Sequence, residues 1–88
     1  PVGIIEDNFD FNLYPNPSSK NIRIQFRDQV QYPLQWTIYN ALGLEIQSGL
    51  LFEESTSLTI SNYSNGIYFL RLYNSNHAVI KSFVKWKD

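Results

Sequence analysis

One run of residues, from Asn65 to Tyr73, constrains the fold of this chain more than any other part of it. An Asn-Gly pair is followed by the segment IYFLRLY. The pair tolerates positive φ and predicts a tight turn, and the residue types that follow it favour a strand. Successive side chains of a strand point to opposite faces, and here both faces carry apolar groups. We therefore expect a central strand with neighbours on both edges.

Shorter runs of alternating apolar and polar residues predict the other strands. The clearest is Ile22 to Phe26, where apolar side chains alternate with Arg23 and Gln25. Together with the central run, the expected strands lie at residues 9–14, 22–27, 34–39, 44–47, 58–60 and 78–87. Pro15 and Pro17 end the first strand in a stiff corner, because proline has no N–H for the ladder and a restricted φ.

Two stretches leave the strand pairing less defined. Ser48-Gly49 predicts a bulge or bend in the strand that begins at Leu44. Leu50-Leu51-Phe52 carries no period, so the register there is open.

The last strand has two faces of different chemistry. One face carries Ala78, Ile80, Val84 and Trp86. The other face carries Val79, Lys81, Phe83, Lys85 and Lys87. We expect the lysine-free face to be buried, which would leave the lysines as a basic strip on the surface.

These strands predict an all-β domain. No window has the spacing of an amphipathic helix over three turns, and strand signals recur about every 8 to 12 residues. About seven short strands point to an immunoglobulin-like antiparallel β-sandwich, with Trp36 as a core anchor. The chain contains no cysteine, so the disulfide of antibody domains is absent.

Length and charge exclude several classes of protein. The 88 residues suffice for one small domain. A formal charge of −1 argues against nucleic-acid binding, which needs a clustered basic surface, and no apolar run is long enough for membrane insertion. We interpret residues 1–8 as the remnant of an interdomain linker and residues 9–88 as the C-terminal domain of a longer protein.

No group of residues predicts catalysis or a metal site. His77 lies in an expected turn without the partners of a nucleophilic triad. Glu53 and Glu54 are adjacent, so on a strand they would face opposite sides. Asp7, Asn8 and Asp10 offer oxygen ligands, but the glycine and the bidentate acid of a calcium loop are missing. We expect no catalytic residue, metal or cofactor.

Two features of the expected surface are candidates for modification or binding. Asn62-Tyr63-Ser64 matches the glycosylation sequon, a short pattern that occurs by chance. The expected outward-facing aromatic residues are Phe69, Tyr73 and Phe83, and they would lie beside Arg71, Lys81 and Lys85. Such an apolar patch with a cationic rim is a candidate docking surface, or a face that packs on a preceding domain.

Several short segments also occur in a specific order. They are LYPNP at 13–17, WTIYNALG at 36–43, Leu58 to Ser61, NGIYFLRL at 65–72 and KSFVK at 81–85. Each alone is common turn or strand chemistry, but their order and spacing up to the C-terminus are distinctive. From about Phe9 to its last residue, the chain resembles the type A C-terminal sorting domain of the bacterial type IX secretion system.

The resemblance implies an immunoglobulin-like sandwich at the end of a large exported protein. The type IX translocon would recognise it after folding in the periplasm, as a signal and not as a catalyst. In the family, a sortase-like peptidase normally removes the domain beyond the outer membrane and attaches the cargo to anionic lipopolysaccharide. Cleavage would then fall within residues 1–8, and the upstream cargo would be secreted or held at the cell surface.

The resemblance also implies which residues the translocon recognises. They are Pro15, Pro17, Gly66, Tyr68, Lys81, Phe83, Val84 and Lys85. Trp86-Lys87-Asp88 extends past the lysine near which many members end. We expect the last strand at a sheet edge, where unpaired backbone groups can accept a receptor strand, and we expect an acidic or strand-accepting surface to read Lys81, Lys85 and Lys87. Whether the edge pairs two copies into a dimer stays open.

Two other functions compete with a sorting signal. One is an immunoglobulin-like spacer or adhesion module that holds a catalytic domain away from the surface. The other is a small carbohydrate-binding module, which would need a flat row of exposed aromatic rings.

Overall fold

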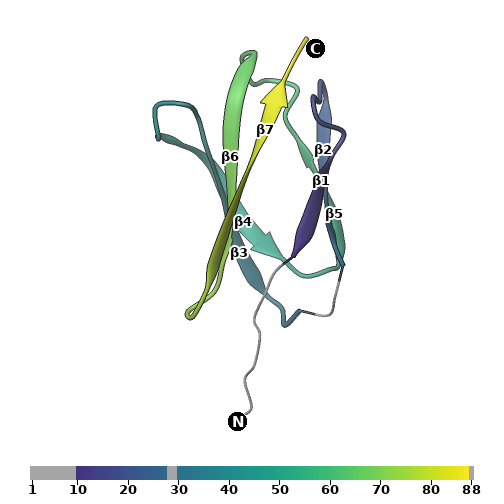
Figure 1. Cartoon of the computed structure of the whole chain (residues 1–88), viewed down its shortest axis with the longest axis vertical. Helices are drawn as coiled ribbons and strands as arrows, with labels where there is room; N and C mark the ends of the chain where they lie inside the picture. Colours follow the sequence, from purple (N-terminus) through teal and green to yellow (C-terminus); the bar gives the residue numbers. More distant parts are fainter. Residues whose placement is uncertain (1–9, 28–29, 88) are drawn as a thin grey trace.

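A computed structural model describes residues 10–27 and 30–87 of the chain (Figure 1). The linker expected at residues 1–8, including the expected cleavage region, lies outside the described residues. So do Phe9, Asp7 and Asn8.

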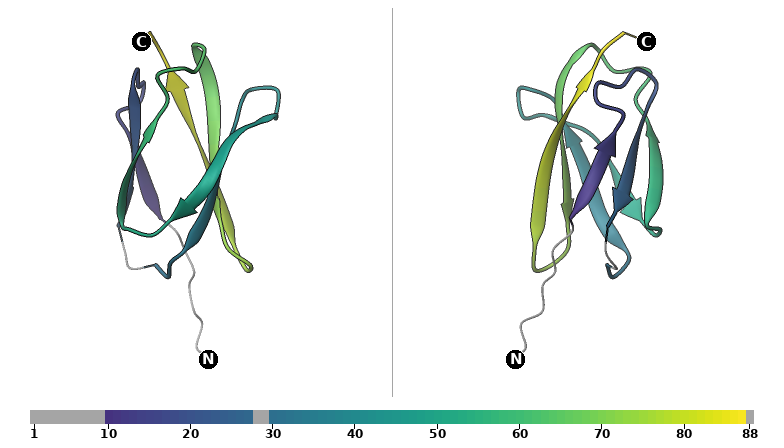
Figure 2. Two further views of the ribbon diagram at one scale, coloured as in Figure 1. Left: turned by 180° about the vertical axis from the view of Figure 1, so that it is seen from behind. Right: turned by 45° about the vertical axis from the view of Figure 1, so that its right-hand side comes forward.

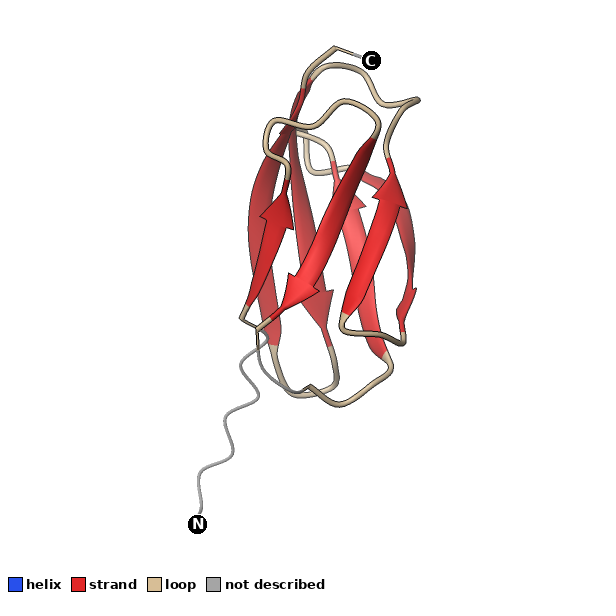
Figure 3. Ribbon diagram, turned by 90° about the vertical axis from the view of Figure 1, so that its right-hand side faces the viewer, coloured by secondary structure: helices blue, strands red, loops and turns tan. Residues whose placement is uncertain are grey.

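In the described part of the chain, seven strands form two antiparallel sheets. They are β1 (Phe11–Tyr14), β2 (Asn21–Phe26), β3 (Leu34–Tyr39), β4 (Glu45–Leu51), β5 (Ser55–Thr59), β6 (Gly66–Tyr73) and β7 (Ala78–Lys85). One sheet has the order β1-β2-β5 and the other the order β4-β3-β6-β7. The sheets lie as two layers, and the described residues contain no helix (Figure 3). The predicted all-β sandwich is confirmed.

Strand β6 has the central position that its composition predicts. It pairs with β3 on one edge and with β7 on the other. Tyr68, Leu70 and Leu72 point into the core, while Ile67 and Phe69 are exposed on the outer face. Gly66, at the start of β6, has a φ of 150°, a value that L side chains rarely adopt.

The core fills the space between the two sheets with side chains from every strand. The alternation in β2 places Ile22, Ile24 and Phe26 inward, and Trp36 from β3 is 6% exposed, as expected for a core anchor. The buried apolar residues are Phe11, Ile22, Ile24, Phe26, Leu34, Trp36, Ile38, Leu51, Leu58, Ile60, Tyr68, Leu70, Leu72 and Phe83.

The break expected at Ser48-Gly49 was wrong, because β4 runs through both residues. The irregularity lies elsewhere, where the pairing with β3 shifts between Ile38 and Tyr39. Gly49 serves packing: a Cβ atom there would lie 2.9 Å from Cζ2 of Trp36. The register through the ambiguous apolar run is now clear, since Leu51 is buried and its two apolar neighbours are exposed.

Strand β7 lies at the edge of the four-stranded sheet, beside β1 of the other sheet (Figure 2). The prediction for its faces was wrong. Phe83 and Lys85 point inward and are buried, whereas Ile80 and Trp86 are 57% exposed. A lysine can occupy an inward position at a sheet edge because its long apolar stem packs in the core while its ammonium reaches polar atoms at the margin.

Candidate recognition site at the C-terminal strand

The corner between β1 and β2 is fastened to the end of β7. The Ser18 N–H donates to the Val84 carbonyl at 2.9 Å, and the Trp86 N–H donates to the Ser18 carbonyl at 2.9 Å. The side-chain Oδ1 of Asn16 accepts the Val84 N–H, also at 2.9 Å. This short parallel bridge satisfies the backbone groups that an edge strand would otherwise expose. The Pro-Asn-Pro corner therefore holds the terminal strand in place.

Within the corner, Ser18 is the buried member and the two prolines are exposed. The Ser18 hydroxyl donates to the carbonyl of Pro15, which closes the corner on itself. Pro15 and Pro17 thus form a rigid projection beside the last residues of β7.

Lys85 is buried at the same end of the sandwich. Its side chain is among the largest fully buried ones, and the residue is only 2% exposed. Its ammonium donates to the carbonyl of Lys87, whose φ of 66° curls the chain back over it. The residues beyond the family-like KSFVK segment therefore have a structural role, since one caps Lys85 and Trp86 bonds to Ser18.

Lys81, also on the inner face, connects β7 to the start of β1. Its Nζ donates to the Phe11 carbonyl at 2.6 Å and lies 4.9 Å from the centre of the Phe11 ring. The same Nζ is 3.8 Å from Oδ1 of Asp10, while Arg27 Nη1 lies 3.1 Å from Oδ2. The hydrogen bond from Arg27, together with the charges of Arg27 and Lys81, holds the pKa of Asp10 below its usual value.

Aromatic packing links β7 to the start of β6. The Tyr68 ring stacks on the Phe83 ring with 5.7 Å between centroids, and the Tyr63 ring lies 5.0 Å from that of Tyr68. The Tyr68 hydroxyl donates to the Ser64 carbonyl at 2.6 Å. Burial raises the pKa of Tyr63, whose hydroxyl donates to Gln47 at 2.6 Å.

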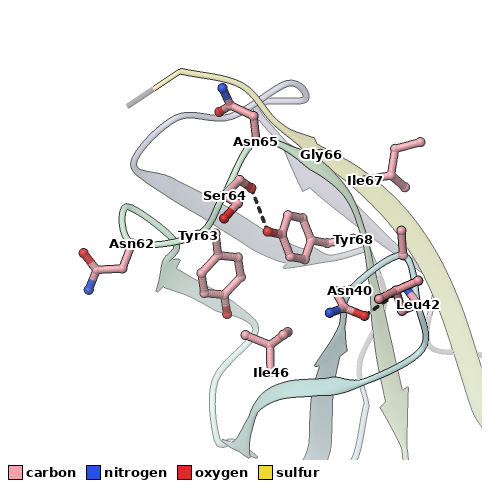
Figure 4. A pocket seen from close by; sticks show the side chains of 11 residues that line it. Asn40, Leu42, Ile46, Asn62, Tyr63, Ser64, Asn65, Gly66, Ile67 and Tyr68 are labelled. Atoms are coloured by element: carbon pink, nitrogen blue, oxygen red, sulfur yellow. Dashed lines mark hydrogen bonds between the residues drawn. The ribbon is translucent and has the colours of Figure 1, made fainter.

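An open groove of about 420 Å³ adjoins this aromatic stack (Figure 4). It lies between the β3–β4 turn and the segment that leads into β6, with Tyr63 and Tyr68 at its base. Its lining contains no Asp, Glu, His, Lys or Arg: Asn40, Ala41, Leu42, Ile46, Asn62, Tyr63, Ser64, Asn65, Gly66, Ile67 and Tyr68. The groove therefore has no charge with which to select an ionic ligand.

The residues singled out by the resemblance come together around β7, but they differ in exposure. Tyr68, Phe83 and Lys85 are buried, Lys81 and Val84 are partly buried, and Pro15, Pro17 and Gly66 are exposed. The expected basic strip was wrong, because Lys85 is buried and Lys81 is engaged by Phe11 and Asp10. Sequence reasoning missed Asn16 and Ser18, although an Asn between two prolines is a signal for side-chain bonding to nearby backbone.

The expected aromatic patch was only partly correct. Phe83 faces the core, while Phe69 is exposed on the outer face of the four-stranded sheet. Arg71 lies over the Tyr73 ring, 4.0 Å from its centre. Of the three cations expected beside the patch, only Arg71 lies on that face, because Lys81 and Lys85 point the other way.

The remaining residues considered for catalysis or metal binding are not grouped into a site in the described part of the chain. His77 lies in the turn before β7, where its N–H donates to Asn74 Oδ1 at 2.9 Å. Over residues 10–27 and 30–87, no three His, Cys, Asp or Glu side chains are grouped as a metal site would need. The same part of the chain has no helix with the length and apolarity to cross a membrane.

Comparison with known proteins identifies the family to which the chain belongs. The family described as "Secretion system C-terminal sorting domain" matches residues 12–86, which is nearly the whole chain. A search of curated proteins found no significant match. The match covers both sheets and includes the Pro-Asn-Pro corner, the Asn-Gly turn and the terminal strand described above. This chain therefore belongs to the C-terminal sorting domains of the type IX secretion system.

Proposed function

We propose that this domain is a non-catalytic signal that directs a larger exported protein through the type IX translocon across the outer membrane. The family match over residues 12–86 is the observation that carries the proposal. The position of β7 at a sheet edge supports it, because a folded signal has to present its recognition element at the surface.

The translocon reads the end of the sandwich at which the Pro-Asn-Pro corner meets β7. The exposed members of the set, Pro15, Pro17 and Gly66, lie where a receptor can touch them. The buried members, Tyr68, Phe83 and Lys85, act by positioning these residues through packing. Because Lys85 is buried and Lys81 is paired, shape and backbone groups contribute more to recognition than positive charge does.

Family membership supports a proposal for the later steps of export. The domain folds in the periplasm, and after transit a sortase-like peptidase cuts the chain before β1 and attaches the cargo to the cell surface or releases it. The partners are then the translocon, the peptidase and the cargo domain. Pairing of two copies along an edge strand is a further candidate association.

A reporter fused ahead of residue 1 in a host with the type IX system tests the proposal. The informative variant is Pro15→Ala with Pro17→Ala, which removes the exposed projection; Asn12→Ala on the outer face of β1 is the matched control. We expect the wild type and the control outside the cell and the double variant in the periplasm. Wild-type reporter that stays in the periplasm would refute the sorting function.

Truncation is a weaker test than substitution here. Removing residues 81–88 also deletes Phe83 and Lys85 from the core, so loss of export would not separate recognition from folding. Each variant domain is therefore checked first by its thermal unfolding midpoint.

The spacer and carbohydrate-binding alternatives make different predictions. A spacer leaves the reporter in the periplasm even when the domain is folded. A carbohydrate-binding module is retained by an insoluble polysaccharide in a pull-down. The buried position of Phe83 removes one of the rings expected to form its platform.

A further inference from the structure

Within residues 10–27 and 30–87, one half of the outer edge of β7 has no hydrogen-bonding partner. Both backbone groups of Val84 point away from β6, because its carbonyl accepts from Ser18 and its N–H donates to Asn16. The β6–β7 register continues without a shift from Lys85 to Ala78. Backbone groups of alternate residues point the same way in an antiparallel strand, so those of Ser82, Ile80 and Ala78 also point outward.

No hydrogen bond from any described residue reaches these outward groups at Ala78, Ile80 and Ser82. Among the described residues, the bonds to the outer edge come from Asn16 and Ser18, beside Val84 and Lys85, whereas Phe11 at the start of β1 lies beside Lys81. The open segment thus covers the first half of β7, next to the turn at Asn74 to His77. Unpaired N–H and C=O groups in a row are a template for another strand.

On the outer face of β7 no charged side chain stands beside this edge; Lys81 points inward, where its ammonium is held by Phe11 and Asp10, and Arg71 lies across the ladder from Ile80. Ala78, Ile80, Ser82 and Val84 form the outer face of β7 and include no charged residue. Ile80 is 57% exposed, and Phe69 of neighbouring β6, which pairs with Ser82, is 36% exposed. Protein edges are usually guarded by lysine, proline or a bulge. An occupant that suits this face is uncharged and apolar on the side next to Ile80.

We propose that the edge at Ala78–Ser82 is the docking site for a short extended segment of the translocon, which adds as a fifth strand to the four-stranded sheet. The segment carries uncharged apolar side chains at alternate positions, which pack beside Ile80. Main-chain hydrogen bonds supply affinity and the alternate side chains supply specificity. The proposal rests on the sorting function and names its partner surface.

The sealed half limits the length of the docked segment. Beyond Ser82 the outward positions are already taken by Asn16 and Ser18. The incoming strand therefore ends beside the Pro-Asn-Pro corner, so that the exposed prolines and the open edge form one continuous surface.

The test compares two isoleucines on the same face of the sheet. Ile80→Lys places a guarding charge on the open edge, whereas Ile67→Lys makes the same change at similar exposure beside the sealed half. Ile80→Pro removes an outward N–H that no ladder bond uses. The reporter fusion of the full domain is assayed for export, and thermal unfolding midpoints identify variants that remain folded.

We expect both Ile80 variants to lower the exported fraction by about tenfold or more, the scale at which about 1.4 kcal/mol of binding is lost, and Ile67→Lys to stay near wild type. If Ile80→Pro unfolds, Ile80→Lys decides the result. Export of a folded Ile80→Lys variant at the wild-type level overturns the docking site while the sorting function stands. Retention of the wild-type fusion overturns both.

A second copy of the domain is the competing occupant. Two β7 edges could pair about Ile80, so the wild-type domain is also examined by sedimentation at high micromolar concentration. We expect a monomer. A dimer that Ile80→Lys dissociates would assign the edge to self-association and overturn the proposal.

Discussion

The two halves of β7 share one strand and one ladder to β6, yet they are held in different ways. In the half toward the C-terminus, Phe83 and Lys85 are buried and the outer edge is bonded to Asn16 and Ser18. In the half that begins at Ala78, Ile80 is exposed and the outward backbone groups have no partner among the described residues. One strand thus combines an anchor with an available edge.

The difference follows from where other segments lie, because both halves have similar strand propensity. The Pro-Asn-Pro corner reaches only the last residues of β7, and β1 begins beside its middle. Substitutions along the strand should therefore have strongly unequal effects on stability. Stability measurements on single variants test this difference.

The largest effect is expected at Phe83. Phe83→Ala removes a fully buried ring that stacks on Tyr68, and such cavities cost about 3–5 kcal/mol. Urea unfolding followed by tryptophan fluorescence measures the loss. A change below about 1 kcal/mol would mean that the sealed half is not an anchor.

A smaller loss is expected when the corner is released. Asn16→Ala removes the acceptor for the Val84 N–H, and a hydrogen bond of this kind contributes about 1 kcal/mol. Hydrogen exchange of the Val84 amide should accelerate in the same variant. Asn12→Ala, an exposed change on the outer face of β1, is the control and should alter neither quantity.

At the boundary between the halves, the contribution of Asp10 depends on pH. Its folded-state pKa is lowered, mainly by the hydrogen bond from Arg27, so its stabilising effect is present above the unfolded-state pKa, near 3.8, and is lost as pH falls through the folded-state pKa. The unfolding midpoints of the wild type and Asp10→Asn should therefore differ at neutral pH and converge in acid. A gap independent of pH would contradict the ion pair with Arg27 and Lys81.

The smallest effect is expected in the open half. Ile80→Thr keeps a β-branched side chain at an exposed position, so unfolding free energy should change by less than about 0.5 kcal/mol. The same urea titration used for Phe83→Ala supplies the comparison. A loss above 1 kcal/mol, roughly the scale of a buried contact, would show that this half is packed as firmly as the other.

Local patterns predicted most of the fold but not the orientation of β7. Clean alternation in β2 and the turn chemistry of Asn65-Gly66 gave correct strands, because polar and apolar residues there separate onto different faces. In β7 both faces carry apolar residues, so alternation alone does not choose between Phe83 and Ile80. The lysines then misled the prediction, since a lysine stem can be buried while its ammonium bonds to a distant carbonyl.

The residues of the candidate site were predicted, but the contacts between them were not. The resemblance named the prolines and the terminal strand, yet the contact between them depends on Asn16 and Ser18, which meet β7 across 66 or more intervening residues in a parallel bridge. Pairing at that separation leaves no periodic signal in the chain.

The class of fold, the approximate positions of the strands, the central position of β6 and the family could be predicted from the residues alone, because these depend on local alternation, turn residues and the order of short motifs. The folded domain was needed to learn which face of β7 is buried, which half of its edge is sealed and which of the candidate recognition residues reach the surface. Burial and edge pairing depend on segments that become neighbours only when the sandwich closes.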